Sequence, residues 1–176
     1  MADNQANDVV PVPQGGEAPA PAAPATAELV QQAFSSVAFP APVVHTSPEG
    51  RTYVRMRTSL WVDGFETFKT DPIGGAGQTV QGTATPVSVT WNLGEGRLVC
   101  DDAGSRDGRT CQYTYKRSSA GRPGGAYSIT ATITWQLTWA CDGAECDAAS
   151  GTLPDQSMTS APTPLVVGEI QTNTGS

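Results

Sequence analysis

Basic residues are scarce in this 176-residue chain, and a long apolar run is missing from it. Ten Lys and Arg stand against 17 Asp and Glu, which gives a net charge of −7. Binding to a phosphate backbone needs a surplus of basic side chains, so this balance argues against nucleic acid as a partner. No stretch reaches the length of apolar sequence that spans a bilayer, so we expect no membrane span.

Motifs for catalysis or cofactor binding are also lacking. The sequence contains no G-x-x-x-x-G-K-[ST], and neither GGAGQTVQ (74–81) nor LGEGRLV (93–99) completes G-x-G-x-x-G, so no phosphate cradle is apparent. His45 is the single histidine, and no G-x-S-x-G elbow is present. We therefore predict that the protein is not an enzyme and binds neither nucleotide nor cofactor. An enzyme would require a compact cleft that holds His45 beside two carboxylates.

Four cysteines in a chain rich in Gly and Pro are typical of structural disulfides. They are Cys100, Cys111, Cys141 and Cys146, and their spacing contains no C-x-x-C that would favour zinc. Three sets of disulfide pairs are possible, and we expect the set in which both bonds are local, Cys100 with Cys111 and Cys141 with Cys146. Disulfides persist in oxidising compartments, whereas the opening MADNQANDVV has no signal-peptide character. We expect a secreted or cell-surface protein whose signal peptide or anchor precedes residue 1; four reduced cytosolic thiols are the alternative.

Composition divides the chain into three parts. Residues 1–26 are rich in Pro and Ala and contain no aromatic residue, which predicts a disordered tether whose APAPAAPA core favours extended polyproline II. Residues 27–50 should hold a short helix and a connector. The helix is predicted over Thr26–Val37, with Thr26 as its N-cap, from apolar residues at helical spacing: Leu29, Val30, Ala33, Phe34 and Val37. The FPAP sequence should end it.

From residue 51 to residue 176 the pattern predicts an all-β domain. In AYSITATITWQLTW the apolar residues occupy odd positions from Tyr127 to Trp139, and Thr or another polar residue occupies the even ones. Shorter stretches repeat this alternation, and we expect these residues to face inward: Val54, Met56, Leu60, Val62, Val87, Val89, Trp91, Cys111, Tyr113 and Tyr115. Such strands, separated by Gly and Pro, indicate an antiparallel β-sandwich.

The segments WNLGEG (91–96) and CQYTYKRSSAGRPGGAYSITATITW (111–135) resemble the polycystic kidney disease (PKD) domain, which pairs a W-x-x-G-D-G turn with a later strand. Together with TSLWVD and GEIQ, they are similar to exported PKD-like proteins of Streptomyces and related actinobacteria, some of which carry an ATP/GTP-binding label. The resemblance runs from about Glu28 to Thr172 and implies an immunoglobulin-like sandwich, without an activity. Glu95 and Gln112 depart from its pattern, which usually has Asp and His there.

Two acidic loops are the candidate metal sites. Asp101, Asp102 and Asp107 lie between the first two cysteines and could offer oxygen ligands to Ca²⁺, and a second acidic group, Asp142, Glu145 and Asp147, surrounds the last cysteine. Neither loop has the spacing of an EF-hand. In an acidic protein such loops are usually solvated, so we predict no bound metal.

The candidate contact residues are aromatic. Trp61 is out of phase with the inward residues Leu60 and Val62, so it could stand on the outer face as a sugar-stacking or protein-contact side chain, and Tyr53 and Trp139 are further candidates. We interpret the chain as a non-enzymatic extracytoplasmic interaction, adhesion or scaffold module that binds protein or cell-wall glycan. A carbohydrate-binding module with coplanar exposed aromatics is the alternative, and a component of a pilus-type surface assembly is a third hypothesis.

Overall fold

The computed structural model of the chain describes residue 15 and residues 24–171. Most of the predicted tether over residues 1–26 therefore lies outside the described residues. The described part is mostly β, with one α-helix, α1 (Thr26–Ser35), and one short 3-10 turn, Pro123–Gly125. This confirms the all-β prediction with one short N-terminal helix.

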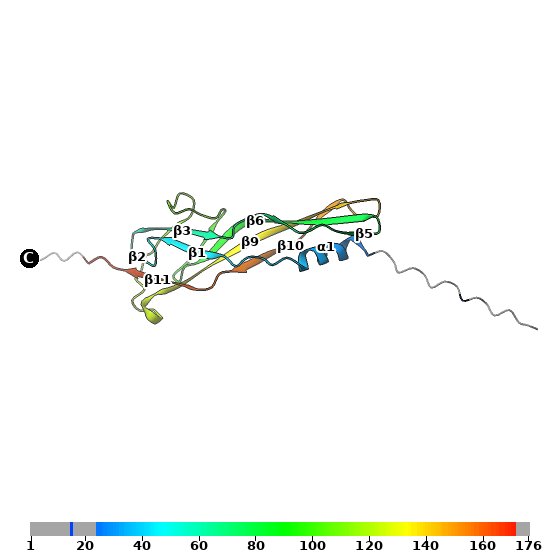
Figure 1. The fold of residues 1–176 in the computed structure, drawn as a ribbon. Helices are drawn as coiled ribbons and strands as arrows, with labels where there is room; N and C mark the ends of the chain where they lie inside the picture. The colour runs from blue at the N-terminus through cyan, green and yellow to red at the C-terminus, as the bar shows by residue number, and fades with distance from the viewer. Residues whose placement is uncertain (1–14, 16–23, 172–176) are drawn as a thin grey trace, which may run out of the picture.

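Two long antiparallel strands, β6 (Gln78–Asn92) and β9 (Tyr127–Asp142), form a ribbon that runs through most of the elongated molecule (Figure 1). Shorter strands line both edges of this ribbon: β10 (Ser150–Thr159) and β11 (Thr163–Gly168) pair with β9, β2 (Arg51–Tyr53) pairs with β11, and β4 (Phe68–Lys69), β5 (Ile73–Gly75) and β7 (Arg97–Cys100) pair with β6. The β2–β11 pair is parallel, and the other described pairs are antiparallel.

A second sheet covers one end of the ribbon. Its order is β1 (Val43–Ser47), β3 (Arg57–Asp63) and β8 (Gln112–Thr114). Leu60 and Val62 of β3 enter one core cluster with Val89, Trp91 and Ile133 of the ribbon. We call this two-layered region the sandwich end.

At the opposite end, α1 packs on β5 and β6 (Figure 1). Leu29 and Val30 of α1 form a small core cluster with Val80 and Cys141 of the ribbon. We call this region the helix end. The chain enters the described fold at the helix end, with Pro24, and leaves it at the sandwich end, with Gln171.

The alternation predicted for β9 is confirmed. The odd positions from Tyr127 to Leu137 are buried, while Thr130, Thr132 and Thr134 are only partly covered. Trp139 departs from the rest because it is half-buried rather than buried. Since the same face of β9 is covered at both ends, α1 takes the place that the second sheet holds at the sandwich end.

The inward placement predicted for Val87 is wrong. A register shift between Pro86 and Ser88 marks a β-bulge, and Val87 is 39% exposed. Pro86 has no N–H for the ladder, which explains why the bulge lies here. Beyond it, β6 changes parity, so that Val80 and Ala84 before the bulge share a face with Val89 and Trp91 after it.

The segment YVRMRTSLWV is not one strand. β2 ends at Tyr53, a turn follows with Arg55 at a φ of 67°, and β3 begins at Arg57. The chain crosses here from the larger sheet to the smaller one, so alternation does not continue through the turn. Leu60 and Val62 are buried as predicted, whereas Val54 is half-buried and Met56 is 38% exposed.

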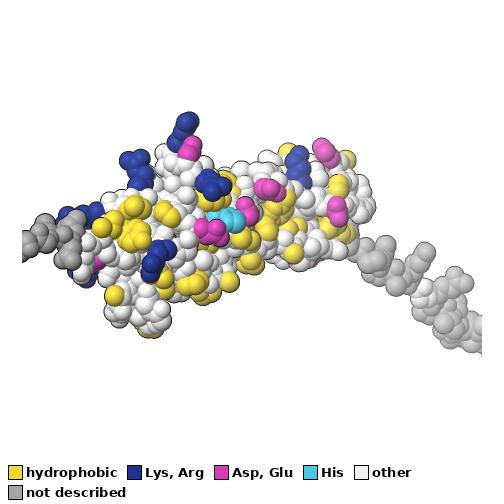
Figure 2. Space-filling model, turned by 60° about the vertical axis from the view of Figure 1, so that its left-hand side comes forward, with side chains coloured by type: hydrophobic (Ala, Val, Ile, Leu, Met, Phe, Trp, Pro, Cys, Tyr) yellow, Lys and Arg dark blue, Asp and Glu magenta, His cyan; other side chains and the backbone are white. Residues whose placement is uncertain are grey.

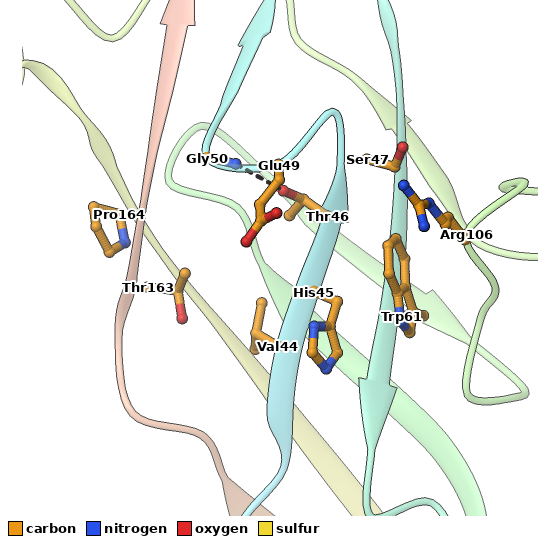
Figure 3. Close-up of a pocket in the computed structure, with 10 residues that line it drawn as sticks. All are labelled: Val44, His45, Thr46, Ser47, Glu49, Gly50, Trp61, Arg106, Thr163 and Pro164. Carbon is orange, nitrogen blue, oxygen red and sulfur yellow. Dashed lines mark hydrogen bonds between the residues drawn. The ribbon is translucent and has the colours of Figure 1, made fainter.

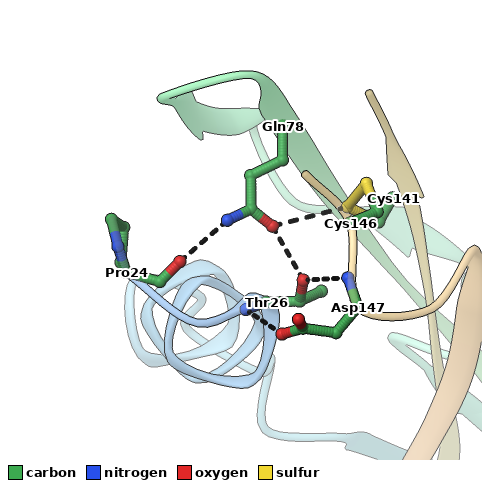
Figure 4. Close-up of a disulfide and its surroundings, with 6 residues drawn as sticks. All are labelled: Pro24, Thr26, Gln78, Cys141, Cys146 and Asp147. Carbon is green, nitrogen blue, oxygen red and sulfur yellow. Dashed lines mark hydrogen bonds between the residues drawn. A yellow bond between two sulfur atoms is a disulfide. The ribbon is translucent and has the colours of Figure 1, made fainter. Parts of the chain in front are cut away.

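The predicted connector over residues 27–50 contains a strand, because VVHTS forms β1. The helix ends at Ser35 instead of Val37, and its N-cap is Ala25 instead of Thr26. The Thr26 hydroxyl instead donates to Gln78 Oε1 at 2.7 Å, and the Thr26 amide donates to Asp147 Oδ2 at 3.0 Å (Figure 4). None of the described helices is long and apolar enough to cross a membrane.

Candidate functional site

A pocket of about 330 Å³ opens beside β1 at the sandwich end (Figure 3). β1 pairs with β3 along one edge, and its other edge, which pairs with no described strand, borders the pocket. Ten residues line it: Val44, His45, Thr46, Ser47, Glu49, Gly50, Trp61, Arg106, Thr163 and Pro164. We call it the His45–Trp61 pocket.

The aromatic part of the pocket is a cross-strand pair. His45 of β1 lies opposite Trp61 of β3, and the two rings stack with centroids 5.4 Å apart and planes 16° apart. His45 Nε2 lies 2.7 Å from Asp63 Oδ2, which fixes the imidazole over the indole. The His45 side chain is 37% exposed, and the histidine is visible at the surface with acidic side chains beside it (Figure 2). Trp61 stands on the face of β3 opposite Leu60 and Val62, as predicted, but the stacked His45 ring leaves it half-buried.

Arg106 reaches the pocket because its loop packs on β3. The Val62 amide donates to the Ala103 carbonyl at 2.9 Å, and Trp61 forms a bridge with Gly104. Gly104 has a φ of +74°, and a Cβ there would lie 2.0 Å from the Leu60 carbonyl oxygen, so only glycine fits this approach. The disulfide Cys100–Cys111 closes the loop at its base.

The turn after β1 and the start of β11 complete the pocket. The Thr46 hydroxyl donates to the Pro48 carbonyl at 2.8 Å and accepts from the Gly50 amide at 3.4 Å, which orders the turn that carries Glu49. Pro164 lies across the pocket from β1 (Figure 3). Because proline has no N–H, this part of β11 cannot supply a backbone donor toward β1.

This arrangement brings side chains of different chemistry to one surface. It joins an aromatic surface, a guanidinium and a carboxylate, which suit recognition of a polar ligand. The enzyme hypothesis asked for His45 beside two carboxylates, and the pocket holds His45 with Asp63 bonded to it and Glu49 nearby. Among the described residues, however, no hydroxyl or thiol hydrogen-bonds to His45, and Ser47 points away from it in Figure 3.

The acidic candidates serve the loop itself. Asp102 Oδ1 accepts from the Gly104 amide and the Thr110 hydroxyl, each at 2.8 Å. Asp107 accepts from the Ser105 hydroxyl and the Arg109 amide, and these two hydrogen bonds lower the pKa of Asp107. Asp101 is exposed. In the described part of the chain, no three His, Cys, Asp or Glu side chains gather as a metal site would require.

The three aromatic candidates do not share one surface. Tyr53 lies on β2, with its ring against Gly168. Trp139 lies at the helix end, packed against the core cluster of α1. Trp61 alone lines the His45–Trp61 pocket. The coplanar platform that the carbohydrate-binding hypothesis requires is therefore not formed by these three residues.

Glu95, one of the two departures from the PKD pattern, has a clear structural role. Its carboxylate accepts from the Tyr113 hydroxyl at 3.2 Å and from the Lys116 and Arg117 amides at 2.7 and 3.1 Å. Tyr115 donates to the Leu93 carbonyl at 3.0 Å. Burial raises the pKa of both Tyr113 and Tyr115, so this tyrosine cluster is held neutral.

The second disulfide, Cys141–Cys146, closes the short loop after β9 at the helix end. The two pairs are thus the local ones, and two disulfides are compatible with an oxidising, extracellular location. Comparison with known proteins finds no matching family model, no matching curated protein and no matching solved structure. The similarity to PKD domains therefore stays a hypothesis.

The sequence pattern does not identify Arg106 and Glu49 as pocket residues, and it puts His45 in the predicted connector within residues 27–50. The β-branched residues of VVHTS were the available signal for β1, and a strand there puts His45 and Thr46 on opposite faces. No local signal could have paired His45 with Trp61 or brought Arg106 to them, because those contacts depend on strand register and loop packing.

Proposed function

We propose that the protein is a non-enzymatic binding module of the cell envelope that recognises a protein partner through the His45–Trp61 pocket. The observation that carries this proposal is the stacked, partly exposed His45–Trp61 pair beside Arg106 and Glu49. Aromatic and Arg side chains together are the residues that contribute most at protein interfaces. The two disulfides and the similarity to exported PKD-like proteins support a location outside the cytoplasm.

The edge of β1 favours a protein over a glycan as the partner. An extended peptide segment can pair with the backbone of an unpaired strand edge while its side chains enter neighbouring pockets. β1 offers such an edge, and the pocket beside it presents both a guanidinium and a carboxylate. A glycan would instead need an open aromatic plane, and one face of Trp61 is already covered by His45.

Sedimentation with actinobacterial envelope fragments tests the proposal. We expect the full chain to co-sediment with untreated fragments, to lose binding after protease treatment of the fragments, and to keep it after muramidase digestion of their glycan. Trp61→Ala should reduce binding by at least about tenfold, the effect of losing one interface hot spot. Met56→Ala, an exposed residue of the β2–β3 turn, is the matched control.

Three outcomes would contradict the proposal. Binding that survives protease but not muramidase would favour the carbohydrate-binding hypothesis. Equal binding by Trp61→Ala and the parent chain would show that the pocket is not the contact surface. Absence of binding to the untreated fragments would remove an envelope partner altogether.

A further inference from the structure

A second hollow lies at the helix end, between α1 and β10. It consists of two adjoining cavities of about 420 and 320 Å³ that share Gln31 and Leu153. Phe34 and Val37 form the wall on the side of α1, and Trp139 and Leu137 of β9 form the floor. We call this hollow the α1–β10 groove.

The groove exists because α1 covers only part of the ribbon. α1 packs on β5 and β6, where Gly82 lets Phe34 lie against the strand; a Cβ at Gly82 would lie 2.4 Å from the Phe34 ring. The neighbouring face of β9 and β10 receives no such cover from the described residues. There Leu153 stays half-buried, and Trp139 lies flat across Gly151, whose Cβ would meet the indole at 2.6 Å.

The lining of the groove suits an uncharged, extended segment rich in proline. Aromatic side chains border it along its length, from Trp139 through Phe34 to Phe39. Gln31 and Gln156 line it with amides that can donate to backbone carbonyls. Among its lining residues only Asp147 is charged. Aromatic-lined grooves bind proline-rich segments in this way because such segments are already extended and lack competing N–H groups.

We propose that residues 9–13 of the same chain, VVPVP, occupy the α1–β10 groove. Twenty-three residues precede Pro24, and the chain enters α1 at Thr26, which with Ala27 lines one end of the groove. Within that N-terminal stretch, Val9, Val10 and Val12 are the only β-branched apolar residues. The segment that precedes Pro24 therefore joins the fold beside one end of the groove.

The lengths agree with this occupant. Five extended residues span about 15 Å at roughly 3.1 Å per residue, and α1, with 10 residues, is about 15 Å long at 1.5 Å per residue. Residues 14–23, which include Gly15 and Gly16, are long enough to return the chain to the groove. This inference is independent of the His45–Trp61 pocket.

NMR spectra of the full chain test the proposal with two variants of equal charge. The double variant Val10→Asp/Val12→Asp should shift the Trp139 indole N–H resonance and the backbone amides of Leu153 and Gln156. The control Ala20→Asp/Ala22→Asp should leave these resonances in place. All four positions precede Pro24, so neither double variant changes a side chain of the described fold. A dilution series of the unsubstituted chain should leave the spectrum unchanged.

Two results would overturn the proposal. Identical groove resonances in the parent chain and in Val10→Asp/Val12→Asp would show that VVPVP does not occupy the groove. Groove resonances of the unsubstituted chain that move on dilution would show that the occupant comes from a second copy.

Discussion

The two ends of the molecule cover the same face of one ribbon by different means. At the sandwich end a second sheet closes over the ribbon, and Leu60, Trp91, Ile133 and Trp135 are fully buried. At the helix end a helix of 10 residues performs this task with four buried side chains in its core cluster. Since the free energy of folding depends mainly on buried apolar area, the sandwich end should be the more stable region.

Polar contacts and a covalent bond supplement the small core of the helix end. The Asp147 amide donates to the Thr26 hydroxyl at 2.9 Å, and the Gln78 side-chain amide donates to the Pro24 carbonyl at 2.8 Å (Figure 4). Cys141–Cys146 holds the loop that carries Asp147. A ribbon whose buried face is continuous should therefore have unequal local stability, because the covering element and not the strand decides how much area is buried.

Ile133→Ala should give the largest effect. Its side chain is fully buried in the sandwich-end core, so the cavity should cost about 2–5 kcal/mol of the free energy of unfolding. Thr132→Ala, on the other face of the same strand, should cost less than about 1 kcal/mol. Denaturant midpoints of the two variants measure the difference. Equal losses would mean that both faces of β9 are covered.

Removal of each disulfide in turn should affect the sandwich end and the helix end differently. The chain-entropy account gives about 3 kcal/mol for Cys100→Ser/Cys111→Ser and about 2 kcal/mol for Cys141→Ser/Cys146→Ser, because their sequence separations are 11 and 5. Only the second variant should raise hydrogen exchange in α1. Urea unfolding and exchange by mass spectrometry provide both values. Faster exchange of α1 in the first variant would show that the ends are coupled.

Alkaline pH should weaken the sandwich end selectively. Burial raises the pKa of Tyr113 and Tyr115 above the value of 10.0 in the unfolded chain, so unfolding releases protons above that pH. The contribution of these tyrosines to the free energy of unfolding is thus present in full below pH 10 and is lost as pH rises further, by up to about 1.4 kcal/mol per pH unit for the buried Tyr115 and by less for the half-buried Tyr113, which solvent screens. Tyr115→Phe should make the fall less steep in thermal melts across that range. A profile as steep as that of the parent chain would contradict this explanation.

The smallest effect is expected at Thr26. Thr26→Val keeps the shape of the side chain but removes the hydroxyl that links Gln78 to the Asp147 amide, at a cost of about 1 kcal/mol. The loss should appear as faster exchange of α1 amides with an unchanged global midpoint. Ser35→Ala, whose exposed hydroxyl bonds only the Gln32 carbonyl among the described groups, is the control. A lower midpoint in Thr26→Val would mean that the helix end unfolds together with the sandwich end.

The sequence was most informative where alternation alone decides the outcome. The parity of β9 from Tyr127 to Leu137 and the apolar face of α1 could both be predicted, because one covered face requires one apolar side. Val87 was misplaced because one bulge reverses parity. The N-cap role predicted for Thr26 was wrong because its amide donates to Asp147, 121 residues away, a contact that no local pattern in the sequence reveals.

The candidate site was less predictable than the fold. Trp61 could be singled out because it is out of phase with Leu60 and Val62, whereas Arg106 enters the pocket only through the packing of its loop on β3. Tyr53, Trp61 and Trp139 were all candidate contact residues because of their aromatic side chains, yet the structure places them in three different regions. Local patterns indicate which face a residue occupies, and strand register decides which residues meet.

Native-state hydrogen exchange along the ribbon tests the central claim most directly, because β6 and β9 pass through both ends. Amides of Val89 and Ile133 at the sandwich end should exchange only through global unfolding, with a free energy equal to that from denaturant melts. Amides of Val80 and Cys141 at the helix end should exchange through a local opening of lower free energy. Equal protection at all four positions, tracking the global value, would contradict the account.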